Sequence, residues 1–216
     1  MAKQLLWHLG EQYKGTPLDP ADCNADPFVE VRNWLALAVD GGIPNANAMT
    51  LATVDDRRRP AARIVLLKEI DDHGFVFYTN YESRKARDLA IHPFAALILY
   101  WEPLHRQIRI EGSIERVDAA DSDAYFASRP RGSQLGAIAS PQSQVLASRT
   151  ELEQKIASLA GQLAESALPP RPDYWGGYRV VPDMIELWQG QPSRLHDRVR
   201  YTLAAGGAWT RERLAP

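Results

Sequence analysis

The chain has 216 residues, of which 45% are apolar and 24% charged, as in globular proteins rather than disordered or fibrous ones. Its 25 Lys and Arg against 27 Asp and Glu give a net charge of -2, which argues against a nucleic-acid partner. The longest apolar run, residues 94–101, is far shorter than a membrane helix, so we expect no membrane segment. The single cysteine, Cys23, cannot form an intrachain disulfide, which favours the cytoplasm.

The first predicted element is a helix that begins at Asp26-Pro27 and ends at Gly41-Gly42. An acidic N-cap followed by proline is a typical helix start, and glycine a typical end. Short runs of apolar and β-branched residues then predict strands at residues 49–54, 61–70, 75–79, 95–101 and 107–117. The connections of about 3 to 6 residues favour antiparallel hairpins, because parallel crossovers need a dozen or more.

Helices are predicted at residues 83–91 and 119–128, and another opens at Ser148, where Glu151 completes a capping box. Apolar residues at helical spacing in this last helix predict a buried stripe of Leu152, Ile156, Leu159 and Leu163. After a proline-rich connector, strands are predicted at residues 177–181, 184–188, 200–203 and 208–211. The sequence therefore predicts a mainly β protein with helices (α+β), built on an antiparallel sheet or barrel.

The common catalytic sequence patterns of phosphate-binding loops, dinucleotide-binding folds and serine hydrolases do not occur in this sequence. The 5 histidines lie in unrelated contexts without metal-ligand spacing, so we expect no metal site. What remains is a set of short cationic motifs with hydroxyl and amide neighbours.

Two of these motifs lie in predicted regular structure. Arg63 and Lys68 are five residues apart on one strand, so alternation places them on opposite faces unless a bulge or the strand end intervenes. Ser83-Arg84-Lys85 opens a helix, whose free N–H groups and positive dipole end suit a phosphate. The alternative without a ligand is that Arg63 and Lys68 are solvated strand residues and that Ser83-Arg84-Lys85 begins an ordinary capped surface helix.

Other candidate donors lie near Pro130 or late in the chain. Ser133 and Gln142 are expected in loops, and Arg194 and His196 project to one side if residues 192–197 are extended. Each also has an interpretation without function: Trp188 alone is typical of a core residue, and His196 alone of a hydrogen-bonded structural histidine. Asp197 next to Arg198 would form a surface ion pair. The donors are Tyr125, Arg129, Ser133, Gln142, Ser143, Arg194, His196 and Arg198. Composition and spacing alone support a β-rich protein able to hold a small anionic ligand.

Taken in order, a series of segments resembles the pyridoxine/pyridoxamine 5'-phosphate oxidase family. They are residues 63–68 (RIVLLK), 78–85 (YTNYESRK), 106–107 (RQ), 128–134 (SRPRGSQ), 175–178 (WGGY), 188–190 (WQG), 194–198 (RLHDR) and 213–216 (RLAP). Each segment is weak evidence alone, but their order along nearly the whole chain is specific.

The resemblance implies an FMN-binding split β-barrel that works as a homodimer, with the flavin at the subunit interface. It implies oxidation of pyridoxamine or pyridoxine 5'-phosphate to pyridoxal 5'-phosphate, with O2 giving H2O2. The implied flavin contacts are Arg63, Ile64, Val65, Leu66, Leu67, Lys68, Tyr78, Thr79, Arg84, Lys85, Gln107, Gln142, Ser143, Trp188 and Arg198. The implied substrate contacts are Lys68, Tyr125, Arg129, Ser133, Arg194, His196 and Tyr13, with Arg194 and His196 as catalytic residues.

The resemblance also divides the chain into an N-terminal segment, residues 1–25, and a single barrel domain, residues 26–216. In the family the N-terminal segment can fold over the substrate as a lid. Tyr13 matches the tyrosine of that lid, whereas Gly10 stands where an arginine is expected.

Two other functions stay open. A related flavin oxidase acting on another ring, such as a phenazine-pathway enzyme, would share the barrel but lack the complete phosphate set of Lys68, Tyr125, Arg129 and Ser133, which is intact here. A non-catalytic FMN-binding protein would bind the flavin without turnover.

Overall fold

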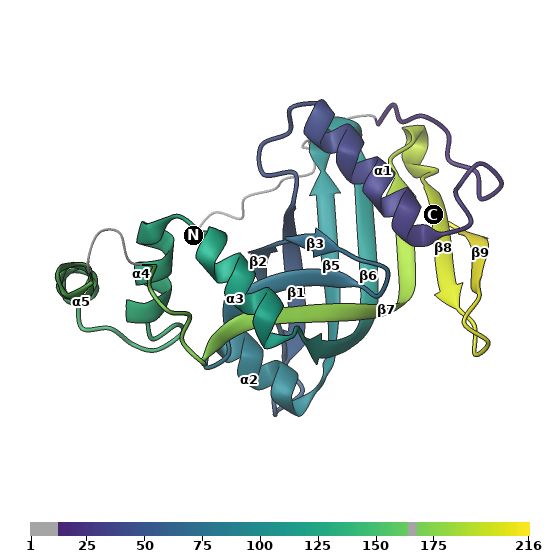
Figure 1. The fold of residues 1–216 in the computed structure, drawn as a ribbon. Helices are drawn as coiled ribbons and strands as arrows, with labels where there is room; N and C mark the ends of the chain where they lie inside the picture. Colours follow the sequence, from purple (N-terminus) through teal and green to yellow (C-terminus); the bar gives the residue numbers. More distant parts are fainter. Residues whose placement is uncertain (1–12, 164–167) are drawn as a thin grey trace, which may run out of the picture. The chain divides into compact units, whose positions relative to one another are not determined.

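The computed structural model describes residues 13–163 and 168–216 (Figure 1). Within them the helices are α1 (Pro27–Asp40), α2 (Arg84–Ile91), α3 (Ala119–Ser128), α4 (Arg131–Ala139) and α5 (Arg149–Gln162). The strands are β1 (Ala48–Val54), β2 (Pro60–Leu66), β3 (Glu69–Ile70), β4 (Phe75–Asn80), β5 (Phe94–Trp101), β6 (Arg106–Arg116), β7 (Trp175–Gln189), β8 (Asp197–Leu203) and β9 (Trp209–Leu214). None of the described helices combines the length and the apolar character needed to cross a membrane.

The strands form one 9-stranded sheet in the order β2-β1-β5-β6-β7-β4-β3, with β8 paired to β7 and β9 to β8. The pairs β1–β2, β3–β4, β4–β7, β7–β8 and β8–β9 are antiparallel. The prediction of a mainly β protein with helices and an antiparallel sheet is confirmed.

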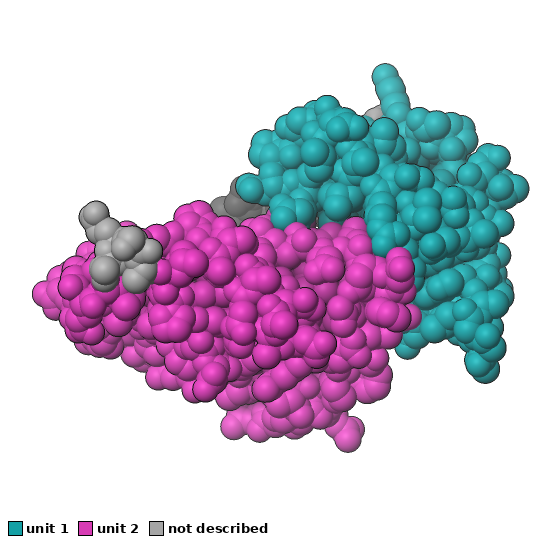
Figure 2. Space-filling model, viewed as in Figure 1, with its two compact units in different colours: residues 1–47, 97–110, 183–216 teal, residues 48–96, 111–182 magenta. Residues whose placement is uncertain are grey.

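The chain divides into two compact units (Figure 2). Unit 1 comprises residues 1–47, 97–110 and 183–216, and unit 2 comprises residues 48–96 and 111–182. The boundaries fall within β5, β6 and β7, so these strands contribute residues to both units.

In unit 1, helix α1 begins as the sequence predicts. Pro27 is its first residue, and the Asp26 carboxylate accepts a hydrogen bond of 2.8 Å from the Phe28 N–H. The buried face of α1 carries Val31, Trp34 and Ala38. The other fully buried apolar residues of this unit come from its strands: Leu97, Leu99, Ile108, Ile110, Ile185, Leu187, Val199 and Tyr201.

In unit 2, β4 is buried over most of its length because both of its faces are covered, and it reads as a nearly continuous apolar run. Its register with β7 places Tyr78 opposite Gly177 and Thr79 opposite Gly176. The fully buried apolar residues of unit 2 include Met49, Leu51, Phe75, Val76, Phe77, Phe126 and Val180.

Two strand predictions differ from the structure in extent. The strand predicted at residues 61–70 ends at Leu66, and the chain resumes as the short β3, with the Lys68 N–H donating to the Val76 carbonyl at 2.8 Å. The strands predicted at residues 177–181 and 184–188 are one continuous strand, β7. Pro182 lies inside β7 without ending it, because proline limits pairing at its own N–H but not the extended backbone.

Two helix predictions also need correction. The segment after Pro130 was expected to be a loop, yet it forms α4, because the Pro130 carbonyl accepts hydrogen bonds from the N–H groups of Ser133 and Gln134 at 2.8 and 3.1 Å. Proline here begins a helix rather than only ending the one before it. The apolar stripe of α5 is half-buried rather than buried, although α5 and α4 pack against each other (Figure 1).

Candidate functional site

A cavity of about 490 Å³ opens in unit 2, within the size range of small-molecule sites. Its charged lining residues are Arg63, Lys68, Lys85 and Arg129, and no Asp or Glu is among the described residues that line it. The uncharged lining residues are Ile64, Val65, Leu66, Tyr78, Thr79, Asn80, Tyr125, Ser133, Gly136, Ala137, Ser140, Gln142 and Trp175. Cations without lining carboxylates suit a ligand with more than one negative charge.

Lys85 is the most buried of the cations, with 9% of its surface exposed. Its Nζ donates to neutral oxygens: Thr79 Oγ1 at 3.1 Å, Ser83 Oγ at 3.3 Å and Gln142 Oε1 at 2.8 Å. Burial, and then the charge of Arg63, lower the pKa of Lys85 to about 8. A buried ammonium among neutral oxygens is stabilised by an anion. This end of the cavity is therefore suited to binding an anionic group.

The orientation of the Arg63 guanidinium is fixed by two hydrogen bonds and an ion pair. Its Nη1 donates to the Leu51 carbonyl at 3.1 Å and to Thr53 Oγ1 at 2.8 Å. Its Nη2 lies 3.7 Å from the Asp88 carboxylate, which also accepts a hydrogen bond of 2.7 Å from Thr53. Arg63 and Lys68 both line the cavity because β2 ends between them, so the opposite-face rule for one strand no longer applies.

A stack of aromatic rings forms a second side of the cavity. The ring centroids of Tyr78 and Tyr125 lie 4.1 Å apart, and those of Tyr78 and Trp175 lie 5.5 Å apart. The Arg129 guanidinium lies 4.8 Å from the centroid of Trp175, and the Lys68 ammonium 5.7 Å from that of Tyr125. Burial raises the pKa of Tyr78 to about 12, so its hydroxyl remains protonated at neutral pH.

Arg129 also has an unused hydrogen-bond donor. Its Nη1 is buried, and within residues 13–163 and 168–216 it has no hydrogen-bond partner. A buried donor without a partner is costly, so this nitrogen is suited to a ligand oxygen.

Three residues of unit 2 that were expected at the flavin, Leu67, Arg84 and Ser143, do not line this cavity. Leu67 is 4% exposed and belongs to the core. The Arg84 N–H donates to Ser143 Oγ at 3.1 Å, which ties the start of α2 to the loop after α4. The Arg84 guanidinium lies 3.6 Å from the Asp55 carboxylate.

The remaining expected site residues belong to unit 1, where three of them form an aromatic group. The ring centroids of Trp188 and His196 lie 4.6 Å apart, and Tyr13 lies 5.6 Å from Trp188 and 5.5 Å from His196. His105 flanks Tyr13 at 4.9 Å.

The hydrogen bond at His196 fixes its tautomer. The Gln191 N–H donates to His196 Nδ1 at 3.1 Å, so Nδ1 carries a lone pair and a neutral ring carries its proton on Nε2. Burial, and then the charge of Arg194, lower the pKa of His196. The imidazole is therefore a neutral Nε2–H donor at pH 7.

Asp197 and Arg198 do not form the surface ion pair of the simpler reading. Successive residues of β8 point to opposite faces, so Arg198 binds Glu186 at 2.8 and 3.1 Å while Asp197 binds Arg213 at 2.7 Å. Glu186, which is 2% exposed, also accepts a hydrogen bond of 2.9 Å from Arg109.

Residues 192–197 are not extended throughout, so the condition under which Arg194 and His196 would project to one side is not met. Residues Pro192–Arg194 form a short 3-10 turn, in which Ser193 and Arg194 have positive φ values of 56° and 61°. Arg194 is exposed, and Gln107 lies half-buried in β6. The two-residue spacing of Arg194 and His196 therefore does not decide their relative direction.

Sequence reasoning assigned no role to Trp175 or Glu186. The motif of residues 175–178 (WGGY) pointed to Trp175, because its glycines indicate close packing. A Cβ on Gly177 would lie 2.9 Å from the Tyr78 ring, so glycine leaves room for the aromatic stack. Glu186 sits in a buried strand without any motif, and only the structure shows that two arginines neutralise it.

Family models and sequence relatives cover most of this chain. Residues 36–162 match the family model described as pyridoxamine 5'-phosphate oxidase, and residues 175–216 match the pyridoxine 5'-phosphate oxidase C-terminal dimerisation region. The pyridoxine/pyridoxamine 5'-phosphate oxidase of Burkholderia ambifaria is 56% identical over 206 residues, covering 94% of this chain and 95% of that protein.

Two solved structures share the fold. The crystal structure of PhzG from Burkholderia lata in complex with tetrahydrophenazine-1-carboxylic acid aligns with a TM-score of 0.87 and 30% identity, over 95% of this chain and 100% of that one. A pyridoxamine 5'-phosphate oxidase-related, FMN binding protein from Nostoc punctiforme aligns with a TM-score of 0.72 and 16% identity, over 89% of this chain and 100% of that one. The predicted split barrel is confirmed at the level of the fold. The extent of the family-model matches and the identity to the Burkholderia ambifaria protein lead to one conclusion: the chain belongs to the pyridoxine/pyridoxamine 5'-phosphate oxidase family.

Proposed function

We propose that this protein is an FMN-dependent oxidase that converts pyridoxamine 5'-phosphate or pyridoxine 5'-phosphate to pyridoxal 5'-phosphate, with O2 as electron acceptor and H2O2 as product. The observation that supports it most is the cavity of unit 2, in which Arg63, Lys68, Lys85 and Arg129 stand beside stacked aromatic rings and no described lining residue is acidic. FMN and the substrate each combine an aromatic ring with a phosphate dianion.

The residues around Lys85 fit the cofactor. Lys85 is hydrogen-bonded to Thr79 and Gln142, and the charge of Arg63 lies near enough to lower the pKa of Lys85. An ammonium, a guanidinium and two polar side chains therefore line the same part of the cavity. Bound FMN supplies a ring that accepts a hydride from the substrate and passes the electrons on to O2. The protein needs no strong nucleophile for this reaction, and its own task is to bind and orient the two rings.

The residues around Arg129 fit the substrate phosphate. Lys68, Tyr125, Arg129 and Ser133 all line the cavity, and the buried Nη1 of Arg129 is free for a phosphate oxygen within the described part of the chain. Charge-assisted hydrogen bonds of this kind contribute about 1.5 to 3 kcal/mol each. We propose these residues as the reason for selecting phosphorylated vitamers.

Arg194 and His196 are the proposed catalytic residues. The neutral His196 ring offers Nε2–H as a donor that orients the substrate, and Arg194 offers a charge for its 3'-oxygen. Trp188, Arg194, His196 and Arg198 all lie in the matched dimerisation region, residues 175–216. We propose a homodimer with each flavin at the subunit interface, which gives these residues their place in the site.

The proposal extends to the N-terminal segment and to the location of the protein. Residues 1–25 serve as a lid with Tyr13 as a substrate contact, and residues 26–216 form the barrel domain; Gly10, where the family has an arginine, lies outside the described residues. The cytoplasm stays the proposed location, because the sequence has a single cysteine.

An aerobic assay of the purified, FMN-loaded protein tests this function. Pyridoxamine 5'-phosphate should take up water and yield pyridoxal 5'-phosphate, ammonia and H2O2 in equal amounts, and omission of O2 should stop turnover after one flavin equivalent. An oxidase acting on a phenazine ring, the second candidate raised by the likeness to PhzG, would oxidise that ring but not the vitamer. A flavin-binding protein without enzymatic activity would retain FMN and oxidise neither.

A further inference from the structure

The C-terminal motif of residues 213–216 (RLAP) has no role in the proposed reaction, yet it contacts the site residues of unit 1. Arg213 Nη1 donates to Asp197 Oδ1 at 2.7 Å, directly beside His196 in the chain. The Ala215 carbonyl accepts a hydrogen bond of 2.9 Å from Arg198 Nη1. The motif therefore contacts Asp197 and Arg198, the two residues that follow His196 in the chain.

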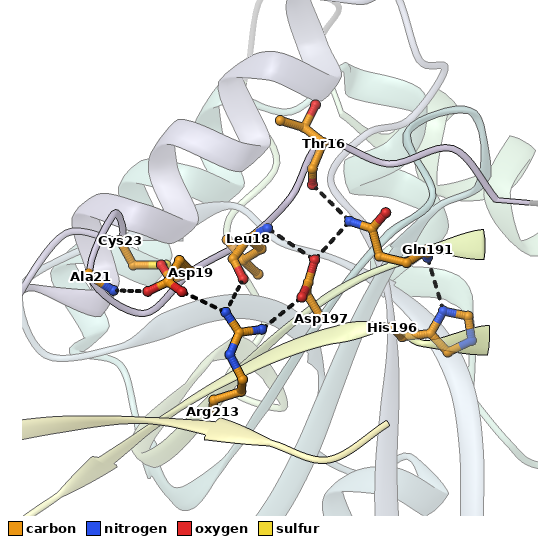
Figure 3. Close-up of polar contacts among 9 residues, drawn as sticks. All are labelled: Thr16, Leu18, Asp19, Ala21, Cys23, Gln191, His196, Asp197 and Arg213. Carbon is orange, nitrogen blue, oxygen red and sulfur yellow. Dashed lines mark hydrogen bonds and ion pairs between the residues drawn. The ribbon is translucent and has the colours of Figure 1, made fainter. Parts of the chain in front are cut away.

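Arg213 also binds Leu18 and Asp19, which precede α1 in the chain (Figure 3). Its Nη2 donates to the Leu18 carbonyl at 3.1 Å and to Asp19 Oδ2 at 2.8 Å. One guanidinium thus joins β9, the start of β8 and the segment of residues 13–19, which we call the strap.

Asp197 is the second anchor of the strap. Its Oδ2 accepts hydrogen bonds from the Leu18 N–H at 3.1 Å and from Gln191 Nε2 at 2.8 Å, and Gln191 also donates to the Thr16 carbonyl at 3.2 Å (Figure 3). Burial raises the pKa of Asp197, but the hydrogen bonds from Leu18, Gln191 and Arg213 lower it below its ordinary value. The carboxylate is therefore charged at neutral pH and pairs with Arg213.

The strap carries Tyr13 to the aromatic group. The Gly15 N–H donates to the Gly190 carbonyl at 3.1 Å, and a Cβ on Gly15 would collide with that carbonyl and with the Gln189 side chain. Only glycine permits this close approach. Tyr13, two residues earlier, then lies against Trp188 and His196.

We propose that Arg213 and Asp197 are positioning residues, which fasten the strap and thereby hold Tyr13 against His196 and Trp188 while substrate is bound. The claim about substrate rests on the proposed function; the claim about the strap does not. Exposed ion pairs are individually weak, and the Asp19–Arg213 pair is half-exposed, so the strap can open for substrate to enter.

The hairpin offers a matched control. Arg200 and Glu212 form an ion pair of 2.8 Å across the same two strands, β8 and β9, at partly exposed positions. Glu212→Gln removes this pair and leaves the hydrogen bonds of Arg213 and Asp197 to the strap in place. An effect that comes only from a weaker hairpin would appear in both Glu212→Gln and Arg213→Met.

The experiment compares full-length, FMN-loaded wild type, Arg213→Met, Asp19→Asn and Glu212→Gln. Amide hydrogen exchange is measured at Leu18 and Gly15, whose N–H groups bind Asp197 and Gly190, and KM and kcat are measured with pyridoxamine 5'-phosphate. Because the lost pairs are exposed, we expect exchange at Leu18 and KM to rise about three- to tenfold in Arg213→Met, less in Asp19→Asn and not in Glu212→Gln. FMN content should be unchanged and kcat should stay within about twofold, since the strap acts on substrate retention.

Unchanged exchange at Leu18 in Arg213→Met would overturn the proposal. So would equal changes in Glu212→Gln, which would assign the effect to the hairpin, or faster exchange with an unchanged KM, which would separate the strap from substrate binding. If the wild type did not oxidise the vitamer at all, the proposed function would fail, and the exchange rates would still decide whether Arg213 fastens the strap.

Discussion

At the scale of single residues, the cavity of unit 2 depends on cations whose partners leave them available to a ligand. Lys85 contacts only neutral oxygens among the partners described, and Arg129 keeps a buried Nη1 without a described partner. Arg63 differs, because Asp88 and Thr53 fix its orientation. These differences give two residue-scale predictions.

Arg129→Ala should raise the KM for pyridoxamine 5'-phosphate by about 10- to 100-fold, because it removes a charge-assisted contact worth about 1.5 to 3 kcal/mol. FMN content should stay at the wild-type level, since Arg129 is assigned to the substrate. Steady-state kinetics and flavin absorbance measure both. Arg149→Ala, on the exposed side of α5, is the matched control and should change neither. Loss of FMN from Arg129→Ala would show that this residue binds the cofactor instead of the substrate.

Lys85 should make FMN affinity depend on pH. Its pKa of about 8 lies below the ordinary value, so the free site loses this charge as pH rises through 8. The phosphate binds the protonated amine, so the Kd of FMN for the apoprotein should increase above pH 8, by up to about tenfold per pH unit. Lys85→Arg keeps a charge at every pH tested and should flatten this dependence. Fluorescence titrations of FMN at pH 7, 8 and 9 measure it, and a constant Kd in the wild type would contradict the assignment.

At the scale of elements, the sequence predicted the regular strands and helices where local chemistry is decisive. The α1 start follows from Asp26 and Pro27, and strands β8 and β9 contain most of the runs predicted at residues 200–203 and 208–211. Helix α4 was missed because Pro130 reads as a helix end, although its carbonyl begins the next helix. The burial of the α5 stripe was overestimated, because spacing shows which residues share a face but not how much the fold covers that face.

Strand alternation leads to an element-scale prediction about Glu186. Its carboxylate is buried and pairs with both Arg198 and Arg109, so Glu186→Gln removes the negative charge that these two guanidiniums contact. We expect the free energy of unfolding to fall by about 1 to 3 kcal/mol. Urea unfolding measures it, and Glu212→Gln, in the exposed pair of the neighbouring hairpin, should change it by less than about 1 kcal/mol. Equal losses of unfolding free energy in the two variants would show that the burial of Glu186 does not increase the contribution of its ion pairs to stability.

At the scale of the whole molecule, the ordered motifs predicted the split barrel, and the family resemblance named 12 of the 17 residues that line the cavity, including all four of its cations. The sequence could not separate them into groups, because residues far apart in the chain, such as Thr79 and Gln142, meet only through the fold. It could not find the strap contacts of Arg213 for the same reason. Tyr13, Trp188 and His196 were named through family resemblance, and the structure adds that their rings form one group.

The homodimer is the prediction at this scale. The match of residues 175–216 to a dimerisation region leads us to expect a particle of twice the 24.2 kDa chain mass, with one FMN per chain. Light scattering coupled to size exclusion, with flavin absorbance recorded on the same peak, measures both. A stable monomer that retained one FMN would contradict the proposal that the flavin binds at the subunit interface.

The most direct test of the central claim is anaerobic mixing of the FMN-loaded protein with pyridoxamine 5'-phosphate in a stopped-flow spectrometer. Flavin absorbance should bleach in a single turnover, with one pyridoxal 5'-phosphate formed per flavin. Pyridoxamine without the phosphate should reduce the flavin far more slowly at equal concentration, because Lys68, Tyr125, Arg129 and Ser133 then have no phosphate to bind. A flavin that stayed oxidised with the phosphorylated vitamer, or that was reduced equally fast by both compounds, would contradict the account.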